Sequence, residues 1–139
     1  MAGQVIISAD ARLAALARLE QQFSAALPDD ALDSLVDASE LLICVRDLRG
    51  HVVRLSKAWE ALLGHSMEEM TGQSLLSLIH PEDVWATHDV MESVNATNPV
   101  VGFVNRYRCR DGSYRRLEWS AKLFGHRVLG VAQDVTASG

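Results

Sequence analysis

The chain contains 139 residues, of which 48% are hydrophobic and 22% charged, and its net charge is −5 at pH 7. This length suits one globular domain, and the composition excludes disordered, collagen-like and purely coiled-coil proteins. The acidic balance argues against a nucleic-acid partner, because proteins that bind phosphate backbones usually carry a basic excess.

The first predicted element is an amphipathic helix over residues 8–27, which ends at Pro28. Large apolar residues recur along one side of this helix, and they are Leu13, Leu16, Leu19, Phe23 and Leu27. Their three- and four-residue spacing suits a partner helix, so we expect a homodimer through this surface. The alternative is that the helix folds back over the open sheet face of its own domain. With a short second helix at 31–38, residues 1–40 form a predicted N-terminal helical extension.

From Leu41 the pattern changes to that of a mixed domain. Strands are predicted at 41–45, 52–55, 100–109, 113–123 and 127–135. Between the second and third strands, helices are predicted at 57–63, 66–70, 74–79 and 81–96. Ser66 and Glu69 have the spacing of a capping box, and Asp111-Gly112 is a strong hairpin signal. This order predicts an α+β fold with one antiparallel sheet and its helices on one face.

Five segments carry a resemblance to a known family, in that family's order. They are 59–72 (WEALLGHSMEEMTG), 78–83 (LIHPED), 105–114 (NRYRCRDGSY), 117–119 (LEW) and 130–136 (GVAQDVT). Over residues 41–136 the chain resembles the PAS family of sensor domains. The resemblance implies a five-stranded antiparallel sheet of order 2-1-5-4-3 with helices on one face, here with an extra N-terminal helix.

The resemblance also implies a function. It indicates a non-catalytic sensor or interaction domain of a bacterial signal-transduction protein, of the histidine kinase or diguanylate cyclase type. Asp134 and Thr136 resemble the exit signal that joins the last strand to an output domain, so residues 137–139 are expected to begin that linker. Ligand binding or dimer rearrangement would then shift the population of output states.

Two versions of this function differ in the interior of the domain. A small-molecule sensor needs a cavity between helices and sheet, whereas a ligand-free dimerisation module fills that space with side chains. The bulky Trp, Phe and Met residues near this space slightly favour the filled interior. The candidate pocket residues are Cys44, Trp59, His88, Met91, Phe103, Asn105, Tyr107 and Trp119. Trp59, Trp85 and Trp119 could form stacking walls for a flat ligand, but such residues are more often core or dimer-face anchors.

Haem is the cofactor alternative, since His88 shares a predicted helix face with Val84 and Met91 and resembles an axial ligand. In that reading Arg106 would contact the iron-bound ligand. The competing interpretation is a half-buried helical histidine bonded to a carboxylate or the backbone. Photoactive flavin is not expected, because Leu75 stands where flavin photosensors of the family carry cysteine, and Ala132 where they carry glutamine. We expect no cofactor.

Other residue clusters can be explained by ordinary structural roles. Five arginines lie around one predicted hairpin, and they form either a binding site for an anion or a solvated edge of the sheet: Arg106, Arg108, Arg110, Arg115 and Arg116. Cys44 and Cys109 are expected to be free core thiols. The remaining histidines lack metal-ligand spacing, and no catalytic set is present. With no apolar run of ~20 residues and no secretory signal, we expect a cytoplasmic protein without membrane contact.

Overall fold

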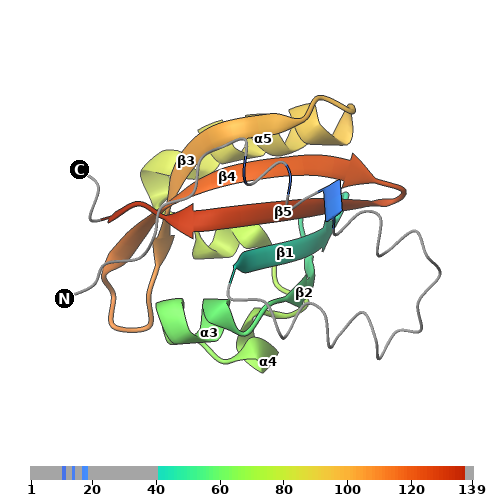
Figure 1. Ribbon diagram of the computed structural model, residues 1–139. Coiled ribbons are helices and arrows are strands. Elements are labelled where there is room, and N and C mark those ends of the chain that lie inside the picture. Colours follow the sequence, from blue (N-terminus) through green and yellow to red (C-terminus); the bar gives the residue numbers. More distant parts are fainter. Residues whose placement is uncertain (1–10, 12–13, 15–16, 19–40, 137–139) are drawn as a thin grey trace.

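The computed structural model describes Ala11, Ala14, Ala17, Arg18 and residues 41–136, and Figure 1 shows their arrangement. The apolar stripe expected within residues 13–27 and the linker expected at 137–139 lie outside these residues. The N-terminal extension, the dimer that it would form and the output linker therefore stay predictions.

The centre of the domain is a five-stranded antiparallel sheet, as predicted. Its strands are β1 (Leu42–Asp47), β2 (Val52–Leu55), β3 (Val100–Arg108), β4 (Tyr114–Phe124) and β5 (Arg127–Asp134). Their order across the sheet is β2-β1-β5-β4-β3, which confirms the expected PAS order. The first and last strands of the chain segment thus lie side by side in the middle of the sheet (Figure 1).

Between β2 and β3 the chain forms short helical elements. They are α3 (Ala58–Leu63), α4 (Met67–Met70), the 3₁₀ turns η1 (Leu75–Leu78) and η2 (Pro81–Asp83), and α5 (Val84–Asn95). The capping box of Ser66 and Glu69 begins α4 as predicted. Residues 74–79 and the start at Pro81 were expected to be α-helical, but they form 3₁₀ turns. Each contains only three or four residues, a length at which i→i+3 hydrogen bonds of the 3₁₀ type are common.

The tight turns are set by aspartate side chains and glycine. Asp47 Oδ1 accepts hydrogen bonds from the backbone N–H groups of Arg49 and His51 at 2.9 and 2.8 Å, which closes the β1–β2 turn. Gly50 in that turn has a φ of +92°, a conformation that favours glycine. The turn between β3 and β4 likewise uses Asp111 and Gly112, as the sequence predicted.

The two faces of the sheet bury different clusters. Ile43 and Val45 on β1 pack with Leu129 and Val131 on β5, on the face away from the α-helices. The helix-facing cluster is larger and contains Trp59, which is fully buried. Alternation along the strands separates the two clusters, because successive side chains point to opposite faces.

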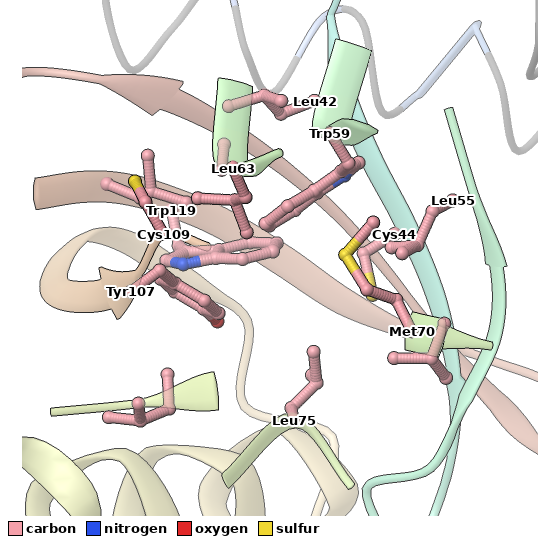
Figure 2. Packing of buried hydrophobic residues seen from close by; sticks show 14 residues of the cluster. Leu42, Cys44, Leu55, Trp59, Leu63, Met70, Leu75, Tyr107, Cys109 and Trp119 are labelled. Carbon is pink, nitrogen blue, oxygen red and sulfur yellow. The ribbon is translucent and has the colours of Figure 1, made fainter. Parts of the chain in front are cut away.

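Trp59 joins α3 to three strands. Its indole Nε1–H donates to the carbonyl oxygen of Ile43 on β1 at 2.9 Å. Its ring centroid lies 5.5 Å from that of Tyr107 on β3 and 5.6 Å from that of Trp119 on β4, and Figure 2 shows the three rings packed together. These separations are typical of favourable aromatic pairs. Trp59 is therefore a core anchor.

Replacing Trp59 with alanine should lower the free energy of unfolding by about 3–5 kcal/mol, because a large buried side chain leaves a cavity. The matched control is Trp85→Ala on α5, whose side chain is 78% exposed, and its effect should stay within about 0.5 kcal/mol. Urea unfolding followed by circular dichroism measures both. Equal losses in the two variants would contradict the assignment of Trp59 as the core anchor.

Candidate functional site

A cavity lies between α5 and the helix-facing side of the sheet. Its empty space is about 470 Å³, including the part open to solvent. Side chains from α5, η1 and all strands except β2 line it: Cys44, Arg46, Leu75, Thr87, Val90, Met91, Val94, Val100, Phe103, Asn105, Tyr107, Trp119, Ala121, Val128 and Gly130. The interior is thus not completely filled by side chains, whereas the bulky residues in the sequence had favoured a filled interior.

Most of the predicted pocket residues do line this cavity. Alternation along β3 places Phe103, Asn105 and Tyr107 on its wall, as expected, and Cys44, Met91 and Trp119 join them from other elements. Trp59 does not line it, because its ring is fully buried in the helix-facing cluster, packed against Trp119 and Tyr107 (Figure 2). Of the two tryptophans predicted to line the pocket, Trp119 lies on the wall, whereas the prediction for Trp59 is corrected, because this residue belongs to the core.

The prediction that His88 lines the pocket is wrong, because the structure places this residue outside the cavity. Thr87, Val90, Met91 and Val94 line the wall at the i, i+3, i+4, i+7 positions of one helix face. His88 is about 100° around the helix from Thr87, and its side chain is 46% exposed. Val84 and Met91, which suggested the wrong face, lie at the edge of the stripe and not at its centre.

His88, the axial ligand that the sequence suggested, is not placed to hold a haem iron in the cavity. The His88 imidazole faces carboxylates instead, with Nε2 3.6 Å from Glu92 Oε1 and Nδ1 3.9 Å from Asp89 Oδ1. The thiol of Cys44 does line the cavity, but burial raises its pKa to about 12, with a smaller opposing effect of Arg46. In the absence of a metal ion, a thiol with so high a pKa stays protonated.

Asn105 holds a buried polar network at the cavity wall. Its Oδ1 accepts from the indole Nε1–H of Trp119 at 3.0 Å, and its Nδ2 donates to the hydroxyl oxygen of Thr87 at 3.2 Å. The predicted need of this asparagine for a partner is thus met within the protein. The network joins β3, β4 and α5 and fixes which face of α5 points inward. Burial also holds the pKa of neighbouring Tyr107 well above its ordinary value, so its hydroxyl stays neutral.

Arg46 is the main residue that the sequence reasoning missed. Its side chain lies among the cavity-lining residues although only 4% of the residue is exposed. Nη1 donates to the carbonyl oxygen of Asp47 at 2.9 Å and to Asn95 Oδ1 at 3.2 Å, and Nη2 donates to the carbonyl oxygen of Met91 at 3.4 Å. Burial lowers the pKa of the guanidinium. Period-two alternation from Leu42 and Cys44 was the signal that could have placed Arg46 inward.

The arginine cluster is mostly paired at the surface. Arg106 is the strongest case: its Nε and Nη2 donate to the two carboxylate oxygens of Asp83 at 2.9 and 2.8 Å, so it does not line the cavity. Nη2 also lies 3.2 Å from Glu82. Two further arginines make ion pairs, Arg110 with Glu69 and Arg115 with Asp134. These pairs agree with the interpretation of the arginine cluster as a solvated edge of the sheet. The suggested contact of Arg106 with an iron-bound ligand is corrected, because Arg106 binds Asp83 instead.

The exit residues Asp134 and Thr136 are anchored to the start of β4. Asp134 Oδ1 accepts from the backbone N–H of Thr136 at 2.9 Å and from its hydroxyl. Thr136 Oγ1 in turn accepts from the backbone N–H of Arg116 at 2.8 Å, and Asp134 Oδ2 lies 3.3 Å from Arg115 Nη1. Arg115 on β4 is the pairing partner of Tyr107 on β3, and Tyr107 lines the cavity. The junction is therefore linked to the cavity wall through one pair of neighbouring strand residues.

Other expectations from the sequence can be compared with the described residues. Cys44 and Cys109 are both buried and free, as predicted. Within residues 41–136 and the four described positions before them, no three metal-binding side chains gather. In the same part of the chain, no helix combines the length and apolar character that crossing a membrane requires.

The sequence pattern of the PAS fold family matches residues 52–132, more than half of the chain. The chain belongs to the PAS fold family. The match begins at β2 and ends in β5, so it contains most of the cavity wall. Arg46 and the exit residue Thr136 lie outside the matched range.

Solved structures of PAS domains share the fold. A PAS domain of an HTR-like protein from Haloarcula marismortui is 24% identical, with a TM-score of 0.64 over 88% of this chain and 99% of that one. A PAS domain from Colwellia psychrerythraea is 25% identical, with a TM-score of 0.64 over 86% and 98%. The PAS domain of the RpfR quorum-sensing receptor of Cronobacter turicensis, in complex with BDSF, is 18% identical, with a TM-score of 0.62 over 73% and 99%. No curated protein matches the chain.

The Asp83–Arg106 pair should make stability depend on pH in a defined direction. The hydrogen bonds from Arg106 lower the pKa of Asp83 in the folded state. The pair therefore stabilises the fold fully above the ordinary aspartate pKa of about 3.9, and this contribution is lost as the pH falls through the lowered folded-state value. The difference in unfolding free energy between wild type and Asp83→Asn should be largest near neutral pH and shrink towards pH 3.

Urea unfolding midpoints at a series of pH values measure this difference. The control is Asp89→Asn, whose side chain is 84% exposed and whose nearest basic atom is 3.9 Å away in His88. Its effect on stability should be small throughout. A difference between wild type and Asp83→Asn that stays constant from pH 6 to pH 3 would contradict the prediction.

Proposed function

We propose that this chain is a non-catalytic PAS sensor domain that binds a small molecule between α5 and the sheet. The observation that carries the proposal is the cavity itself, with Arg46, Thr87, Asn105 and Tyr107 as polar groups in a largely apolar wall. A concave, mostly apolar space with a few convergent polar groups is the usual form of a small-molecule site. A module that only dimerises has no need of such a space.

The second part of the proposal is the route from ligand to output. Tyr107 and Trp119 lie on the cavity wall, and their strands β3 and β4 are paired without interruption from Phe103–Trp119 to Arg108–Tyr114. The start of β4 holds Asp134 and Thr136 through Arg115 and Arg116. A ligand that prefers one position of β3 and β4 therefore changes how the chain leaves the domain after Thr136.

The wider setting belongs to the same proposal. The domain works in the cytoplasm as part of a bacterial signalling protein, with a histidine kinase or diguanylate cyclase as output. Two buried free thiols suit a reducing compartment. Support for small-molecule binding by this fold comes from the RpfR domain in complex with BDSF and from the Drosophila Cycle PAS-B domain with bound ethylene glycol.

The test is an NMR titration of the isotope-labelled chain with small organic fragments that include acids, amides, alcohols and amines. A binding fragment should shift the amide signals of cavity residues and also that of Thr136, because the junction is hydrogen-bonded to β4. Ala121→Leu, which fills the cavity from β4, should remove these shifts.

The matched control is Ala86→Leu on the exposed side of α5, which adds the same atoms outside the cavity and should leave the shifts unchanged. Shifts confined to surface residues, or shifts that survive Ala121→Leu, would overturn the proposed site. Cavity shifts without any response at Thr136 would overturn the route to the output.

A further inference from the structure

Arg46 presents a buried positive charge that has no carboxylate partner within the described part of the chain. The three hydrogen bonds of its guanidinium go to neutral oxygens, on Asp47, Met91 and Asn95. The carboxylate of Asp47 accepts from the backbone of its own turn, and that of Glu92 lies beside His88. Both influence the pKa of Arg46, but no carboxylate among residues 41–136 lies within ion-pair distance of it. A charge removed from water in this way is costly unless an anion compensates it.

The polar groups of the cavity also offer more donors than acceptors. A guanidinium has five N–H donors, and the three hydrogen bonds of Arg46 leave its Nε–H among those without a partner in the described structure. The hydroxyl of Thr87 accepts from Asn105 and still has its own proton to donate. The Tyr107 hydroxyl stays neutral because it is buried, and it interacts with the side chains of Asn105 and Trp119. Such a wall favours a ligand that brings acceptor atoms and negative charge.

The size of the interior limits the ligand. Because its empty space of about 470 Å³ includes the part open to solvent, the enclosed part suits a small organic molecule. Apart from the polar groups named above, the wall is apolar, with Val90, Val94, Phe103 and Val128. A short aliphatic chain matches this remainder, whereas a phosphate ion would leave it without contact.

We propose that the cavity takes a short-chain monocarboxylate, with the carboxylate on Arg46 and the aliphatic chain against α5 and β3. This assignment rests on the proposed small-molecule site and names its ligand class. Planar guanidinium groups bind carboxylates through two parallel N–H···O bonds. The ligand would therefore join β1 to α5 through Arg46 and add a full negative charge within ion-pair distance, where the described residues offer only neutral carbonyl and amide oxygens.

The test compares butyrate with butyramide, its neutral match in size, by NMR titration of the same chain. Butyrate should bind at least about tenfold more tightly, since a hydrogen bond to a charged group contributes more than a neutral one. The Arg46 Nε–H signal should shift with butyrate. In Arg46→Met the preference should disappear, whereas Arg46→Lys, which keeps the charge, should keep part of it. Arg108→Met, which removes an exposed arginine of β3, should leave it unchanged.

Each other outcome has a distinct meaning. Equal affinity of butyrate and butyramide in the wild type overturns the carboxylate assignment and leaves the small-molecule site standing. A butyrate preference that persists in Arg46→Met places the anion elsewhere and overturns the role of Arg46. Failure of butyrate, butyramide and every other fragment to shift the cavity signals overturns the proposed function as well. The wild-type comparison remains decisive even if Arg46→Met does not fold.

Discussion

The indole of Trp59 is the contact on which the interior depends. Its hydrogen bond to the Ile43 carbonyl fixes α3 on β1, and its packing on Tyr107 and Trp119 joins this end of the helical block to β3 and β4. Gly130 completes the arrangement, since a Cβ there would meet the Trp119 ring at 2.8 Å. The aromatic rings thereby fill one part of the space over the sheet, and the cavity occupies the part beneath α5.

The position of α5 is set by polar groups as much as by apolar ones. Asn105 accepts from Trp119 and donates to Thr87, so only one rotation of the helix satisfies the buried amide. Arg46 reaches the last turns of the same helix through Met91 and Asn95, where a positive charge also meets the negative end of the helix dipole. Buried polar groups with satisfied partners specify one arrangement, because every alternative leaves a group unpaired.

The same strands that form the cavity wall also hold the chain exit. β3 pairs with β4, and the start of β4 binds Asp134 and Thr136 through backbone and side-chain hydrogen bonds. PAS domains with 18–25% identity share this fold, yet identity at that level leaves the cavity side chains free to differ. The chemistry of binding therefore has to be argued from Arg46, Thr87 and Asn105 of this chain, whereas the route to the exit follows from the strand pairing.

Local patterns in the sequence predicted the strands, caps and turns, whereas the order of the strands in the sheet was implied by the resemblance to the PAS family. The Ser66–Glu69 capping box, the Asp111-Gly112 turn and the inward alternation of Phe103, Asn105 and Tyr107 depend on neighbours only a few residues apart, so the sequence determined them by itself. The rotation of α5 depends on contacts with distant strands. Val84 and Met91 suggested a face that included His88, but the hydrogen bond from Asn105 selects Thr87.

Arg46 shows most clearly what only the tertiary structure decided. In the sequence it follows an apolar run and precedes a turn, which is an ordinary place for a solvated arginine. Alternation turns it towards the helices, and α5 then covers it with Asn95 and Met91 from about fifty residues further along the chain. Whether a charged side chain is buried, and whether it finds a counter-ion there, depends on which segments pack over it, and no local pattern contains that information.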